Sequence, residues 1–158
     1  MNKTAKNLIG IGVAGAAAFG LSKLCDKVIK RPAPSDEPEK QETREEYIER
    51  AETRRKNNDL LMSMHPENLS IKSIDGLDMR AWFVPAEKPS NKFVICVHGY
   101  KCNGPDEMSH IMSFYHNDLG FNYLLPDLTA HGRSEGKYIG FGSFDAKNIL
   151  LWTDYLIN

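Results

Sequence analysis

The sequence predicts an α/β domain built on a doubly wound sheet and preceded by a segment outside its core. Two observations predict this class. Five consecutive apolar residues, from Phe93 to Val97, are typical of a strand buried on both faces, as in a parallel sheet. A second apolar strand, FNYLLPD, follows after a stretch with helical periodicity, and such alternation of strands and helices is characteristic of α/β folds.

Composition divides the chain into three parts. Residues 1–24 are small and apolar, residues 25–64 are heavily charged, and residues 65–158 carry the strand and helix patterns of a core-forming domain. The net charge of −1 gives no basic excess for binding nucleic acid, so no nucleic-acid partner is predicted. The three cysteines, Cys25, Cys96 and Cys102, lack the spacing of a disulfide framework or a zinc site, and no metal is predicted.

The amino-terminal part predicts a membrane helix. Residues 7–22 contain no charge and are flanked by lysines, although a spanning helix usually needs about 20 apolar residues. A cleaved signal peptide, with Ala16 to Ala18 as the small-residue site, is the main alternative. A buried Gly/Ala-rich helix is the third. More basic residues follow the segment than precede it, which favours a single-pass anchor with the remainder on the cytoplasmic side.

The charged part predicts a spacer followed by a solvated helix. The stretch RPAPSDEPEK contains three prolines and is typical of an extended linker. Thr43 and Glu46 then match a capping box, and Glu46 lies one helical turn before Arg50. The helix is expected to end near Met64 and to form a stalk between the membrane and the domain.

The residue pattern of the domain predicts a hairpin followed by two strands and two helices in alternation. Apolar and polar residues alternate on both sides of Asp75-Gly76, which indicates a hairpin. The strand from Phe93 comes next, then a helix over residues 106–119, then a strand that ends at Asp127. A second helix is expected from Ser143 as N-cap, with its apolar side formed by Ile149, Trp152 and Leu156.

Two loop motifs point to a family. The stretch VICVHGYKCNG, followed some thirty residues later by LLPDLTAHGRSEG, resembles the α/β-hydrolase family over residues 69–158, with membrane-anchored, serine aminopeptidase-like members as the nearest in kind. The second motif carries Ala130 where many such proteins have glycine. The resemblance implies a strand order of 1-2-4-3-5. It also implies hydrolysis of an ester, amide or thioester through an acyl-enzyme, with a small-molecule or peptide acyl substrate and no cofactor.

The same resemblance implies the site residues. In the family, the backbone N–H after the His-Gly pair helps to form the oxyanion hole, a role that falls here on Tyr100, with His98 and Gly99 as binding residues. Gly99 to Gly104 also spells the first half of a phosphate loop, but Pro105 and Asp106 stand where Lys and Ser/Thr are needed.

Ser134 lies in a literal G-x-S-x-G, yet the sequence argues against a nucleophile. A nucleophile elbow joins a strand directly to a helix, and the triad histidine follows it in the chain. No histidine follows Ser134. We therefore expect Ser134 to stabilise its loop, His98 and His131 to pack two adjacent loops, and Asp127 to accept backbone hydrogen bonds.

The chain is thus expected to hold the N-terminal half of a hydrolase domain, inactive alone, without the fifth strand, the elbow or the triad histidine. The strand from Phe93 to Val97 would then present an unpaired edge. The alternative is a noncatalytic, membrane-tethered half-domain that pairs with another chain through this strand.

Overall fold

The computed structural model describes residues 19–31 and 42–158, which fall into two units, Met1–Lys30 and Arg31–Asn158. In the first unit, residues 19–29 are helical. Most of the predicted anchor or signal segment, residues 1–24, lies outside the described residues. Within the described ranges, no helix is both long enough and apolar enough to cross a bilayer.

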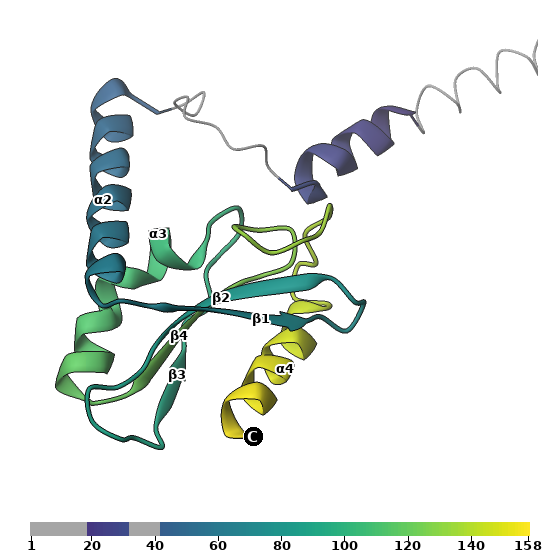
Figure 1. The fold of residues 1–158 in the computed structure, drawn as a ribbon. Coiled ribbons are helices and arrows are strands. Elements are labelled where there is room, and N and C mark those ends of the chain that lie inside the picture. The colour runs from purple at the N-terminus through teal and green to yellow at the C-terminus, as the bar shows by residue number, and fades with distance from the viewer. Residues whose placement is uncertain (1–18, 32–41) are drawn as a thin grey trace, which may run out of the picture. The chain divides into compact units, whose positions relative to one another are not determined.

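The second unit contains a four-stranded sheet in the order β1-β2-β4-β3 (Figure 1). β1 (Glu67–Lys72) and β2 (Asp78–Val84) form the predicted antiparallel hairpin. β2 is also antiparallel to β4 (Asn122–Asp127), whereas β3 (Phe93–Ile95) is parallel to β4. The order agrees with the first four strands expected from the resemblance, but the sheet is mixed because the hairpin runs against the parallel pair.

β4 is the centre of the fold, and all six of its residues are buried. Side chains alternate across a strand, so β4 contributes to two cores. Tyr123 and Leu125 belong to one cluster, with Val84 of β2, and Leu124 belongs to the other, with Met79 of β2.

The first core is covered by a broken helical segment. α3 (Gly104–Met108) continues into a 3-10 turn, η1 (Ser109–Ile111), and then into a π-helical turn, η2 (Phe114–Asp118). The prediction of one regular helix over residues 106–119 is therefore wrong in detail. Apolar residues of this segment nevertheless face the sheet as expected, and Met112 is fully buried in the first core.

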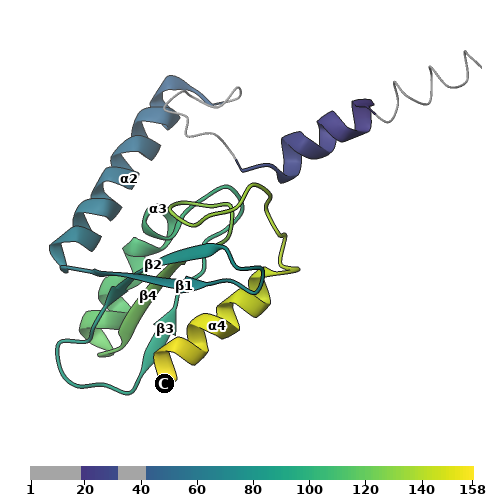
Figure 2. The ribbon, with the colours of Figure 1, turned by 45° about the vertical axis from the view of Figure 1, so that its right-hand side comes forward.

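α2 (Arg44–Ser63) packs beside α3 and was not fully anticipated (Figures 1 and 2). Its predicted capping box, between Thr43 and Glu46, is confirmed. Arg50, however, pairs with Glu42 rather than Glu46. The expectation of a solvated stalk is wrong for the carboxyl-terminal half, where Leu61 is fully buried in the first core.

The second core is covered by α4 (Asp145–Ile157), on the opposite face of the sheet from α2 and α3 (Figure 2). Trp152 is 1% exposed and packs with Met79 and Leu124, as the apolar pattern predicts. The prediction of Ser143 as the N-cap is wrong. Phe144 takes that position, and the Asp145 carboxylate accepts a hydrogen bond from the Gly142 N–H at 2.7 Å, which holds the preceding turn.

β3 forms one edge of the described sheet. Pairing with β4 continues one residue beyond it, where the Cys96 N–H donates to the Leu124 carbonyl at 2.9 Å. Phe93 is 37% exposed, so the prediction of a strand buried on both faces is wrong at its start. Val94 packs against the first core and Ile95 against the second, so both faces are partly covered further along the strand, which pairs with β4 alone in the described residues.

Candidate functional site

Two loops follow the parallel strands β3 and β4 at their carboxyl ends, where α/β folds place their ligands. The first begins with His98 and contains Gly99 and Tyr100. The second begins at Leu128 and ends near Gly136. Both loops start at the same end of the sheet because the strands are parallel and adjacent, and two histidines connect them.

His98 belongs to the first loop and is 3% exposed. Its Nε2 accepts a hydrogen bond from the Leu128 N–H of the second loop at 3.0 Å. A nitrogen that accepts carries no proton, so the proton of the neutral ring is on Nδ1. That nitrogen then donates to the Gly99 carbonyl at 2.8 Å.

His131 of the second loop makes the reciprocal connection. Its Nε2 accepts from the Lys101 N–H of the first loop at 3.2 Å, and its Nδ1 lies 3.0 Å from the Thr129 carbonyl. Burial lowers the pKa of His131, which favours the neutral ring. The two imidazoles meet edge to face, with centroids 4.9 Å apart. The prediction that these histidines pack two adjacent loops is confirmed, and neither ring has a nitrogen left to act as a base.

Asp127 ends β4 and is 1% exposed. Its carboxylate accepts from the backbone N–H groups of Gly104 at 3.3 Å and Arg133 at 3.0 Å. The Arg133 side chain completes an ion pair at 3.1 Å and stacks 3.9 Å from the centroid of Trp82. Burial lowers the pKa of Arg133, and the Asp127 charge offsets only part of this effect. The predicted role of Asp127 is confirmed.

Ser134 is 1% exposed, and its hydroxyl is fully engaged with backbone. Oγ accepts from the Arg80 N–H at 2.8 Å and donates to the Asp127 carbonyl at 2.5 Å. The Glu135 N–H donates to the Asp78 carbonyl at 2.8 Å, so this loop runs along β2. A buried hydroxyl that already donates its proton to a carbonyl has no base to activate it. Ser134 therefore stabilises its loop, as predicted.

Left-handed backbone shapes the same loop. Gly132 has φ of 45°, and a Cβ there would lie 2.4 Å from the Asp127 carboxyl carbon. Ala130 has φ of 62°, a conformation that normally favours glycine. The alanine that distinguishes this motif therefore occupies a position where glycine would be less strained.

The peptide between Gly99 and Tyr100 is held on its carbonyl side. The Gly99 carbonyl accepts from His98 Nδ1 at 2.8 Å and from the Cys102 N–H at 3.4 Å. No cis peptide bond occurs in the described residues, and in a planar trans peptide the N–H is directed opposite to the carbonyl. The Tyr100 N–H is thus directed away from His98. The Gly99 N–H donates to Glu107 at 2.5 Å.

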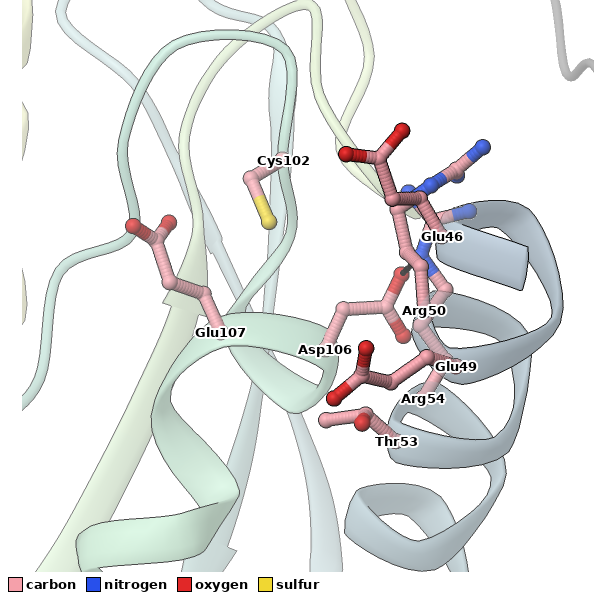
Figure 3. A pocket seen from close by; sticks show the side chains of 8 residues that line it. All are labelled: Glu46, Glu49, Arg50, Thr53, Arg54, Cys102, Asp106 and Glu107. Carbon is pink, nitrogen blue, oxygen red and sulfur yellow. Dashed lines mark ion pairs between the residues drawn. The ribbon is translucent and has the colours of Figure 1, made fainter. Parts of the chain in front are cut away.

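A cavity of about 430 Å³ lies beside this loop, between α2 and α3 (Figure 3). Its lining is charged and comprises Glu46, Glu49, Arg50, Thr53, Arg54, Cys102, Asp106 and Glu107. Arg54 pairs with Asp106 at 3.3 Å across it. Burial, followed by contributions from Glu107 and Asp106, raises the pKa of the Cys102 thiol to about 11, so it is protonated at neutral pH.

Comparisons with known proteins agree with a hydrolase-like fold. No protein-family model matches the chain. The uncharacterized protein YqkD of Bacillus subtilis strain 168 is 30% identical over 79 residues, which are 50% of this chain and 25% of that protein. Two crystal forms of the esterase Pf2001 of Pyrococcus furiosus are 31% identical, with TM-scores of 0.50 and 0.51 over 60% of this chain.

The chain spans only about a third of the length of the esterase, 36% in one crystal form and 37% in the other. Over that part the neighbours support the α/β-hydrolase superfamily. Membrane anchoring and a serine aminopeptidase-like character stay predictions.

Sequence reasoning missed three features of this region. Arg133 was not predicted as the partner of Asp127, although the two lie six residues apart around one tight loop. Glu107 was not connected with Gly99, because the pattern showed only that it belonged to a helix. The docking of α2 through Asn57, whose amide donates to the Asp106 carbonyl at 2.7 Å, was also missed. The adjacent Leu60 and Leu61 could have indicated it.

Proposed function

We propose that this chain carries the oxyanion-loop part of an α/β-hydrolase-fold serine hydrolase, which cleaves an ester, amide or thioester through an acyl-enzyme. The Tyr100 N–H is the proposed donor to the developing oxyanion, with His98 and Gly99 shaping the loop. The nucleophile, the acid and the base are assigned to no residue of this chain, and we expect the chain alone to be inactive.

The observation that supports this best is the fixed direction of the Gly99–Tyr100 peptide. His98 holds its carbonyl, and Leu128 of the neighbouring loop holds His98. A donor held in this way needs no reorganisation when negative charge develops, and one such donor is worth roughly 3 kcal/mol. The loop also lies at the carboxyl end of β3, and α/β folds bind their ligands outside the carboxyl ends of the strands.

The proposal can be tested in a chimera. Residues 42–158 would replace the corresponding part of the esterase Pf2001, which supplies its own remaining elements. Tyr100→Pro removes the backbone N–H, whereas Tyr100→Phe keeps it and serves as the matched control. We expect the proline variant to lose roughly 100-fold or more in kcat toward an activated acyl ester. Equal activity of the two variants in a folded chimera would contradict the assignment.

A second candidate function is a noncatalytic half-domain that pairs with another polypeptide through the strand from Phe93 to Val97. It is favoured by the edge position of β3 and by the exposed Phe93. The Phe93 N–H faces away from β4, because the Lys92 carbonyl of the same trans peptide accepts from the Asn122 N–H of β4. Phe93→Pro would therefore block a ladder on the open edge, and Phe93→Thr would keep this backbone donor. Sedimentation velocity should show a complex with the threonine variant that is lost with proline. A monomer in both cases would count against pairing.

Attachment to the cell membrane through residues 1–24, with the remainder on the cytoplasmic side, is part of both proposals. Fractionation of cells that produce the whole chain, or the chain from residue 25 onward, tests it. The whole chain should sediment with membranes and resist carbonate extraction. Recovery of a shortened, secreted chain would instead favour the signal peptide.

A further inference from the structure

Glu107 connects the loop of Gly99 to the body of the domain. It lies on α3, and its carboxylate is directed toward the loop that carries Cys102 rather than toward α2 (Figure 3). Oε2 accepts the Gly99 N–H at 2.5 Å. A Cβ on residue 99 would lie 3.2 Å from Oε1, so glycine permits this close approach of the carboxylate.

α3 is a firm base for that contact. The Asn103 side chain caps its first turn through the Asp106 N–H at 3.0 Å. Gly104 packs so closely that a Cβ there would lie 3.1 Å from the Leu125 Cβ of β4. Its N–H donates to the buried carboxylate of Asp127. The backbone that carries Glu107 is thus tied to the centre of the sheet.

Two successive peptides of the loop are therefore held from different sides. Glu107 holds the N–H of Gly99, and His98 holds its carbonyl. Glycine has wide freedom in both backbone dihedrals, so a clamp on one side alone would leave the residue able to rotate. With both clamps in place, the peptide that ends in the Tyr100 N–H has a single direction.

We propose that Glu107 is a positioning residue of the oxyanion loop: its charged hydrogen bond to Gly99 sets the direction of the Tyr100 N–H. The term oxyanion loop rests on the proposed function, whereas the claim that Glu107 sets the direction of the Tyr100 N–H does not. Glu107 touches no reacting atom in this proposal and acts only through Gly99.

Three variants of the chain test the proposal by NMR. Glu107→Ala removes the acceptor, Glu107→Gln keeps an acceptor oxygen without the charge, and Glu49→Gln removes a charge from the same cavity on the α2 side. Hydrogen exchange of the Gly99 amide should accelerate about fivefold in the alanine variant, which corresponds to roughly 1 kcal/mol. It should accelerate less with glutamine, and the α2 variant should match the parent.

The direction of the Tyr100 N–H is measured by its residual dipolar coupling. We expect this coupling to change in Glu107→Ala, to return largely in Glu107→Gln, and to be unaffected in Glu49→Gln. Amides of β4 measured in the same samples report on the fold. They distinguish this pattern from a general loss of stability. If the alanine variant does not fold, the Gly99 amide proton should still move upfield with glutamine.

The pKa of the Cys102 thiol gives a second readout of the Glu107 charge. This pKa of about 11 includes a raising contribution from Glu107, so the pKa should fall in Glu107→Gln. An unchanged Tyr100 coupling in a folded Glu107→Ala variant, or an unchanged Gly99 shift with glutamine, overturns the proposal. None of these measurements uses an acyl substrate, so this result is separate from the outcome of the Tyr100→Pro chimera.

Discussion

Ser134→Ala tests whether the serine of the G-x-S-x-G motif is a structural residue. The substitution removes one hydroxyl and no carbon atom from a site that is 1% exposed. It leaves the Arg80 N–H without its acceptor and the Asp127 carbonyl without its donor. No cavity large enough for a methyl group is created, so the cost is almost entirely that of two unsatisfied backbone groups.

The magnitude follows from that count. A buried polar group left without a partner costs about 1–3 kcal/mol. The bond to Arg80 is only partly buried, which places its contribution at the lower end. We therefore expect the free energy of unfolding to fall by about 2–4 kcal/mol. With a urea slope of about 2 kcal/mol/M, in the middle of the usual range for small proteins, the unfolding midpoint moves down by roughly 1–2 M.

Urea unfolding followed by tryptophan fluorescence measures this change, because Trp152 is buried in the second core. Ser63→Ala is the control, since the Ser63 hydroxyl bonds only the Leu60 carbonyl at an exposed position and should cost less than about 0.5 kcal/mol. A loss below 1 kcal/mol for Ser134→Ala would refute the structural assignment. So would fluorophosphonate labelling of the parent chain that disappears in this variant.

Three further outcomes are expected. Leu61→Ala should lower the free energy of unfolding by about 2–5 kcal/mol in the same assay, because α2 inserts this side chain into the first core. Gly132→Ala should cost more than about 2 kcal/mol or prevent folding, because its Cβ would lie 2.4 Å from the Asp127 carboxyl carbon, whereas alanine at Gly120 meets no atom within 4 Å. The third concerns pH: His131 protonates near 6.5 when unfolded and at lower pH when folded, so stability should decline as pH falls below about 6.5. His131→Gln should flatten that decline, and an identical pH profile would contradict it.

The sheet and its two loops could be predicted from local patterns. The apolar runs at Phe93 and at Asn122 are long enough to indicate strands, and the hairpin turn at Asp75-Gly76 is marked by its residues. The roles of Ser134 and Asp127 also followed, because a missing histidine and a strand-ending aspartate are visible in the chain itself.

The remainder depends on contacts between distant segments. Nothing near Glu107 indicates that its carboxylate reaches Gly99, eight residues earlier across a turn. The irregular turns after α3 arise where tertiary packing overrides a regular apolar period. The start of α4 shifted because Asp145, and not Ser143, supplies the side chain that holds the preceding turn.

The insertion of Leu61 has a practical consequence for anyone who expresses this domain. A boundary placed at residue 65, where the strand pattern begins, would delete a side chain that closes the interior and uncover Met112 and Tyr123 beneath it. Such a truncated polypeptide would expose apolar side chains that chaperones bind, and it would be more open to proteases. A boundary that keeps α2 lies at or before its cap at Thr43, some twenty residues upstream of where the alternating pattern begins.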